Sequence, residues 1–187
     1  TAKNAPADLD GDGAVEFGEA LPEANVLKAS ADLLATKAAD LAAAAQQWQP
    51  SEADAFTALV VMVPTMTEYF DSWKNSRFVA GESSQQRDFV AISRLSDIQN
   101  ILGSLQVVHQ GVSPLITRVD PAQDQQIGQQ LSDLKDFVAG VYTQEQSGKR
   151  IKAEDADLLG AEAQNRATAI TGQVAQVAAK LNITIEQ

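Results

Sequence analysis

The sequence predicts an all-α protein, an up-and-down antiparallel bundle of four to five long helices with a short acidic loop in front of it. Three observations support this fold class. Hydrophobic residues make up 44% of the chain but aromatic residues only 5%, and this Ala- and Leu-rich composition favours packed helices over sheet. Apolar residues recur at intervals of three and four along five segments, which short links containing Pro, Gly or Ser separate. No strand pattern competes with these helical ones.

The acidic loop is the stretch ADLDGDGAVEFGEA, residues 7–20. With Asp8 as the first loop position, Gly13 falls at the sixth, where the absence of a Cβ permits a sharp turn. This is the ligand order of an EF-hand calcium loop, in which carboxylates and one backbone carbonyl surround the ion. Val15, at the eighth position, is expected to pack inward. The alternative interpretation is a solvated acidic linker. The predicted Ca²⁺ ligands are Asp8, Asp10, Asp12, Ala14, Glu16 and Glu19.

The surroundings of this loop differ from those of an ordinary EF-hand. Only seven residues precede Asp8, and Pro6 is one of them, so no proper entering helix is expected. Pro22 cuts the exiting helix short, and the sequence contains no second loop of this kind. A structural or weak calcium site is therefore predicted rather than a sensor, and such a site suits the high calcium of an extracytoplasmic space. The predicted division is residues 1–22 for the calcium-binding segment and 23–187 for the bundle.

Five helices follow in order. Pro64 should kink the second of them. Ser113–Pro114 should interrupt the helical conformation at the end of the third. Asp120 followed by Pro121 is a helix start signal, with a capping residue before a proline in the first turn. In the last helix, Leu158 and Leu159 are both expected to face inward. The predicted helices span approximately 23–48, 51–78, 85–112, 121–146 and 153–181.

Residues suited to catalysis are few. His109 is the only histidine and the chain has no cysteine, so nucleophilic dyads, disulfides and the common zinc sites are not expected. A lone histidine on a helix is usually a surface or packed residue. Two carboxylate pairs, Glu68 with Asp71 and Asp133 with Asp136, each lie on one helix face and are expected to be solvated. The protein is therefore predicted not to be an enzyme.

The charge and hydropathy of the chain limit its partners. The net charge is −11, which argues against nucleic acid and anionic membranes as partners. No apolar run approaches the ~20 residues of a transmembrane helix. The chain shows no signal peptide and begins at Thr1 rather than at Met, as a processed mature form or a trimmed form of a longer chain would.

From Ala24 onward the chain resembles the imelysin-like family, specifically the second half of EfeO-type periplasmic proteins. The resemblance rests on TEYFDSWKNSRFVAGE, on LSDIQNILGSLQ with Pro114 downstream, on RVDPAQDQQIGQQLSDLKDFVAGV and on KAEDADLL. It implies a helical bundle, an extracytoplasmic location and an association with iron uptake or, in some relatives, with polysaccharide binding. The HxxE metal motif of the family is absent, because Val112 stands three residues after His109, and Ile92 and Arg94 lie where relatives carry His and Asp.

These observations predict a non-enzymatic, periplasmic or otherwise extracytoplasmic calcium-binding bundle. It would be an accessory or binding component of iron uptake or of the cell envelope, with a calcium ion and another envelope or metal-uptake protein as partners. One alternative is an iron or transition-metal carrier that uses carboxylates on the helices. Another is a polysaccharide or protein adaptor with Trp48, Tyr69 or Trp73 in a groove, although Trp73 is expected in the core.

Overall fold

The computed structural model describes residues 4–9, 11–15, 19–84 and 92–185 of the chain. Contacts between residues divide it into two compact units, Thr1–Pro50 and Ser51–Gln187, which are described separately below. The predicted domain boundary after residue 22 remains a prediction. Within the described residues, no helix has the length and apolarity needed to span a bilayer.

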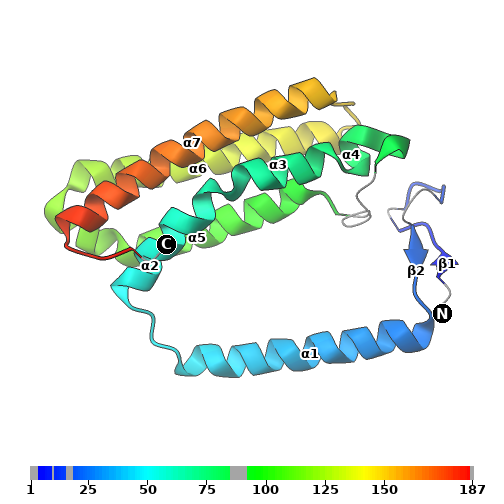
Figure 1. Cartoon of the computed structure of the whole chain (residues 1–187), viewed down its shortest axis with the longest axis horizontal. Helices are drawn as coiled ribbons and strands as arrows, with labels where there is room; N and C mark the ends of the chain where they lie inside the picture. Colours follow the sequence, from blue (N-terminus) through cyan, green and yellow to red (C-terminus); the bar gives the residue numbers. More distant parts are fainter. Residues whose placement is uncertain (1–3, 10, 16–18, 85–91, 186–187) are drawn as a thin grey trace. The chain divides into compact units, whose positions relative to one another are not determined.

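The second unit is an antiparallel bundle of four rods (Figure 1). The first rod is kinked and consists of α2 (Glu52–Met62), the 3₁₀ turn η1 (Val63–Thr65) and α3 (Met66–Lys74). The short elements α4 (Arg77–Ala80) and η2 (Gly81–Ser83) follow it. The other rods are α5 (Arg94–Val119), α6 (Pro121–Gln146) and α7 (Ala153–Lys180). The order of packing is α5 on α6, α6 on α7, and the kinked rod on both α7 and α5. This arrangement confirms the predicted all-α bundle.

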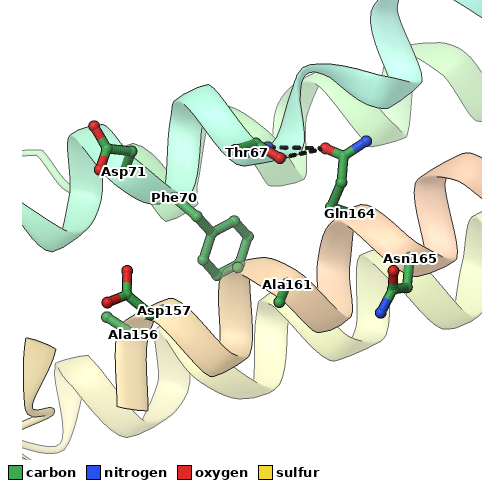
Figure 2. Close-up of a pocket in the computed structure, with 9 residues that line it drawn as sticks. Thr67, Phe70, Asp71, Ala156, Asp157, Ala161, Gln164 and Asn165 are labelled. Carbon is green, nitrogen blue, oxygen red and sulfur yellow. Dashed lines mark hydrogen bonds between the residues drawn. The ribbon is translucent and has the colours of Figure 1, made fainter. Parts of the chain in front are cut away.

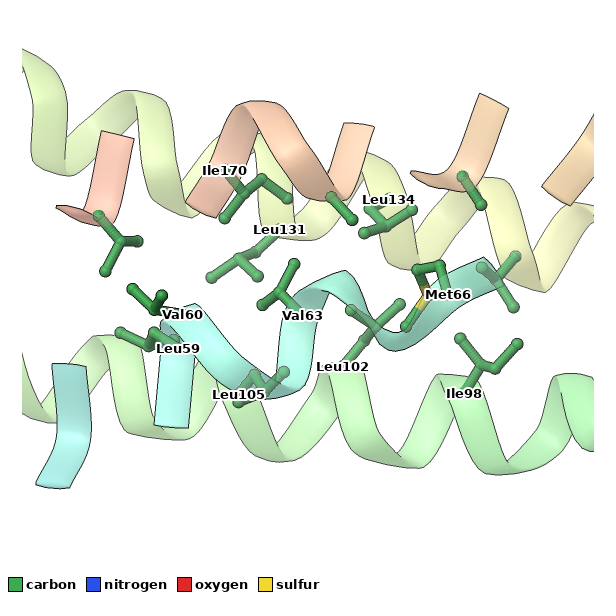
Figure 3. Packing of buried hydrophobic residues seen from close by; sticks show 14 of the residues in the cluster. Leu59, Val60, Val63, Met66, Ile98, Leu102, Leu105, Leu131, Leu134 and Ile170 are labelled. Carbon is green, nitrogen blue, oxygen red and sulfur yellow. The ribbon is translucent and has the colours of Figure 1, made fainter. Parts of the chain in front are cut away.

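The core between the rods consists mainly of aliphatic side chains that alternate between neighbouring helices (Figure 3). Each rod contributes a stripe at helical spacing, so every turn of one helix buries a side chain against the next. Burying one such side chain stabilises the fold by about 1.5–3 kcal/mol. Members of this cluster from all four rods include Leu59, Val63, Met66, Ile98, Leu102, Leu105, Leu131, Leu134 and Ile170.

The two internal prolines have different effects. The predicted kink at Pro64 is confirmed, because the helix changes there to the 3₁₀ turn η1, which accommodates a residue without an N–H. The predicted interruption at Ser113–Pro114 is wrong, since α5 continues through Pro114 to Val119. Pro114 lies on the exposed side of α5, where water can satisfy the carbonyl that loses its helical hydrogen bond.

Two helix starts have side-chain caps, and the start at Asp120–Pro121 is where the sequence predicts it. The third helix, predicted from residue 85, begins at Arg94 after a cap at Ser93, and residues 85–91 of the predicted span lie outside the described residues. Ser51 and Asp54 form a capping box at the start of α2, with Ser51 Oγ accepting from the Asp54 N–H at 3.1 Å. Asp120 alone links α5 to α6, and its carboxylate accepts from the Gln123 N–H at 3.0 Å. The other oxygen of Asp120 accepts from Lys180 Nζ at 2.7 Å, near the end of α7. The predicted bounds of these last two long helices are confirmed.

In α7 the expectation for Leu158 is wrong. Its side chain is 71% exposed, whereas Leu159 packs against the core. Consecutive helical residues differ by about 100° around the axis, so only one of the two leucines can face inward.

The first unit contains a two-stranded sheet, β1 (Ala5–Pro6) with β2 (Ala20–Leu21), and the helix α1 (Ala24–Gln47). All 24 residues of α1 are described, and none is buried. The periodic apolar residues of α1 are the reason why it is predicted to belong to the bundle, and this remains a prediction. That periodicity correctly predicts a helix with an apolar face, but it does not indicate what covers the face.

A close approach between α3 and α7 gives a first testable prediction. A Cβ on Gly160 would lie 2.9 Å from the Cβ of Phe70, an atom that cannot move without its backbone. We expect Gly160→Ala to destabilise the protein by about 1–3 kcal/mol through overpacking, despite the better helix propensity of alanine. Urea denaturation measures the change.

Gly172 is the matched control in the same helix, because a Cβ there meets nothing within 4 Å. Gly172→Ala is expected to stabilise the protein by about 0.5–1 kcal/mol. Equal effects of the two substitutions would contradict the close packing of α3 on α7.

Candidate functional site

The predicted calcium loop is closed at its base by the small sheet of the first unit. β1 and β2 pair in antiparallel register, with Ala5 opposite Leu21 and Pro6 opposite Ala20. One further backbone bond continues the ladder, from the Ala7 N–H to the Glu19 carbonyl at 3.2 Å. Asp8, the first loop position, therefore directly follows hydrogen-bonded backbone at one end of the loop. Glu19, the twelfth position, belongs to the hydrogen-bonded backbone at the other end.

Asp8 organises the turn that follows it. One carboxylate oxygen accepts from the Gly11 N–H at 2.7 Å, and the other accepts from the Gly13 N–H at 2.9 Å. Gly11 and Gly13 have φ values of 78° and 89°, in the left-handed region that favours glycine. The requirement for glycine at the sixth loop position is thus met by the backbone geometry.

Glu19 returns to the start of the loop. Its Oε1 accepts from the Leu9 N–H at 3.0 Å, and the residue is only 2% exposed. Asp12 accepts from the Ala14 N–H at 2.8 Å and stays on the exposed side of the loop. The expectation that Val15 packs inward is wrong, since it is 53% exposed. The described residues ahead of the loop, 4–7, contain β1 and no helix that could bury it.

The structure places four of the six predicted ligands, Asp8, Asp12, Ala14 and Glu19, in this loop. Asp10 and Glu16 lie outside the described residues. Among the residues that are described, no three His, Asp or Glu side chains are grouped closely enough to hold a metal ion.

The bundle has a groove of about 370 Å³ between α3 and α7 (Figure 2). Gln164 Oε1 accepts from both the N–H and the hydroxyl of Thr67, at 3.0 and 2.8 Å. Lys74 Nζ donates to both carboxylate oxygens of Asp157, at 2.7 and 2.9 Å, and this raises the pKa of Lys74. Thr67 is thus paired with Gln164 and Lys74 with Asp157, so none of these four side chains is an activated nucleophile or base.

His109 is packed between α5 and α6, and its 7% exposure agrees with one of the two expected roles. Its Nε2 lies 3.1 Å from Asp124 Oδ1. The hydroxyls of Ser113 and Thr117 donate to the other oxygen of Asp124, at 2.7 and 3.0 Å. In a catalytic triad the hydroxyl must bond to the histidine, and here it bonds to the carboxylate. The cluster therefore joins two helices and does not activate a nucleophile.

Of this cluster, only His109 stands out in the sequence by itself. One signal was available, because His109, Ser113 and Thr117 recur every four residues and so share a face of α5. That spacing marks a polar stripe, but the partner on α6 becomes visible only when the two helices are paired.

Glu145, near the end of α6, was also missed. It accepts from Trp73 Nε1 at 2.6 Å and from Ser93 Oγ at 3.0 Å. Burial raises the pKa of Glu145, and these two hydrogen bonds only partly oppose that effect. Trp73 itself is fully buried, which confirms the prediction that it belongs to the core.

The comparison with protein families decides what kind of bundle this is. The family model described as imelysin, peptidase family M75, matches residues 5–176. This chain belongs to the imelysin family. The imelysin match extends from β1 into α7, so it covers the acidic loop and α1 as well as most of the bundle. No curated protein and no solved structure matches the chain.

The half-buried carboxyl of Glu145 gives a second testable prediction. Since the folded-state pKa of Glu145 is raised, the folded state binds its proton more tightly than the unfolded state does. Its contribution to stability is complete below the unfolded pKa of about 4.3 and is lost as pH rises through the folded pKa. Glu145→Gln keeps an acceptor for Trp73 and removes the charge, so its denaturation midpoint relative to wild type should rise with pH. Urea denaturation between mildly acidic and neutral pH measures this difference.

Glu154→Gln makes the same chemical change on the exposed surface of α7 and serves as the control. A difference between Glu145→Gln and wild type that does not vary with pH would show that burial does not perturb this carboxyl.

Proposed function

We propose that this imelysin-family protein is a non-catalytic, extracytoplasmic helical bundle that binds one calcium ion through residues 8–19. It acts as an accessory or binding component in metal uptake, of iron in particular, or in the cell envelope. The imelysin-like resemblance associates such chains with iron uptake, and the family match supports a role of that class.

The observation that carries the calcium proposal is the return of Glu19 to the start of the loop. Glu19 is buried and bound to the Leu9 N–H, so the first and last ligand positions already lie close together. Positive φ angles at Gly11 and Gly13 support the same loop conformation. A cation would then be held by Asp8, Asp10, Asp12, Ala14, Glu16 and Glu19, which supply oxygens of the kind that Ca²⁺ prefers. Five of these side chains are carboxylates, and the ion would offset part of their mutual repulsion.

The location outside the cytoplasm is supported by the same loop. EF-hand sites of low affinity work where calcium is abundant. Within the described residues β1 rather than a helix leads into this loop, and the sequence shown has no second loop of this kind; both features favour low affinity.

A non-catalytic role is supported by the two polar sites of the bundle. In the groove Lys74 is hydrogen-bonded to Asp157, and between α5 and α6 the hydroxyls of Ser113 and Thr117 donate to Asp124 rather than to His109. A polysaccharide or protein adaptor could not use Trp73 for binding, because this side chain is buried, but it could use Trp48, which is exposed. The carboxylate-based iron carrier remains an alternative for the titration below.

Calcium binding is the third testable prediction. Calorimetric titration of the metal-free full chain should detect one calcium per chain. Asp8→Asn and Glu19→Gln should each abolish the signal, because each removes a charge from the predicted ligand set. Glu19→Gln keeps an oxygen that can accept from the Leu9 N–H, and Asp8→Asn keeps one of the two oxygens that accept from Gly11 and Gly13. Circular dichroism should show an unchanged helix content in both variants, because the bundle lies in the other unit.

Asp136→Asn, an exposed change on α6, is the control for net charge and should leave the titration unchanged. Absence of heat and of any bound calcium at millimolar concentration would refute the proposal. A subsequent titration with ferrous or ferric ion that gives binding in all four proteins would instead favour a transition-metal carrier on the bundle.

A further inference from the structure

The start of α3 has no cap from its own segment. The first N–H groups of a helix have no acceptor inside it, and a side-chain oxygen of the preceding residue normally accepts from the second or third of them. Helices α2, α5 and α6 begin with such a cap. The residue before α3 is Thr65, whose side chain makes no capping bond. Its hydroxyl instead donates to the Met62 carbonyl at 2.8 Å.

The acceptor that α3 requires comes from α7. Thr67 is the second residue of α3, and its N–H donates to Gln164 Oε1 at 3.0 Å (Figure 2). This is the bond that an N-cap side chain makes, but here the acceptor lies 97 residues away in the sequence. The Thr67 hydroxyl donates to the same oxygen at 2.8 Å, so one amide oxygen of α7 binds the first turn of α3 twice.

A second polar contact keeps α3 and α7 in the same register. Lys74 donates to Asp157 at 2.7 Å. Lys74 lies seven residues after Thr67, and Asp157 lies seven residues before Gln164, so the two contacts are about two turns apart on both helices. Between them, the absence of a side chain at Gly160 lets the two helices approach closely. The capping oxygen is therefore positioned by the docking of α3 along α7, and not by the local chain.

The proline of the joint makes this cap important. Pro64 has no N–H, so an unbroken ladder of backbone bonds cannot lead from α2 into α3. We infer that Gln164 is the N-cap of α3 supplied by α7, so that the first turn of α3 is complete only while α3 is docked on α7. The joint at η1 is then rigid in the docked state, and separation of α3 from α7 at the groove releases it. All of these residues belong to the second unit.

Amide hydrogen exchange of the full chain, followed by NMR, tests this inference. Gln164→Met keeps the length of the side chain and removes the acceptor. We expect the Thr67 amide of this variant to exchange about fivefold faster or more, as the loss of a typical cap allows. The Phe70 amide, in the interior of α3, reports opening of the whole helix, so the ratio of the two exchange rates isolates the cap from a general loss of stability.

Two further variants separate the oxygen from its surroundings. Gln164→Glu keeps an acceptor and places a negative charge at the start of α3, so the Thr67 amide should stay protected. Asn165→Ala is the matched control, because it changes the next residue of α7 in the same groove and should leave the ratio as in the wild type. An unchanged ratio in Gln164→Met would overturn the inference, since Thr67 would then be protected by its own rod. Equal loss of protection in Gln164→Met and Gln164→Glu would also overturn it, because packing rather than the oxygen would then protect the amide.

Discussion

The bundle depends on close packing between the kinked rod and α7. At Gly160 the backbone of α7 comes so near to Phe70 that a single methyl group would not fit. Phe70 also packs edge-to-face against Trp73, with ring centroids 5.6 Å apart. Trp73 in turn donates to Glu145, which links α3 to the end of α6. One glycine thus sets the distance at which an aromatic pair and a half-buried carboxyl can connect three helices.

Much of the fold could be predicted from the sequence because the signals were local. The start of α6 follows from Asp120 and Pro121, and the kink at η1 follows from Pro64, whose missing N–H breaks the helical ladder. The helix break predicted at Pro114 is wrong because the effect of a proline depends on more than the local sequence. Proline ends a helix when the freed carbonyl is left without a partner, and the exposure of Pro114 supplies one in water. That exposure depends on how α5 is rotated against α6, which no single segment specifies.

The same distinction applies to the sites. The acidic loop could be found because all its residues fall within a window of fourteen. Gly13 adopts the positive φ that its place in the spacing predicts. The contacts of His109 with Asp124 and of Trp73 with Glu145 join residues from different helices, and their formation depends on tertiary packing.

The single-residue link at Asp120 has a consequence for folding kinetics. Two helices of 26 residues each reverse direction across one residue, so the entropy lost on closing the loop between them is close to its minimum. The α5–α6 hairpin is therefore the pair whose association requires the least chain ordering, and its contacts have low sequence separation. The kinked rod must reach α7 across most of the bundle, with Thr67 and Gln164 separated by 97 residues. A folding nucleus in the hairpin, with later docking of the first rod, follows from this difference in loop length.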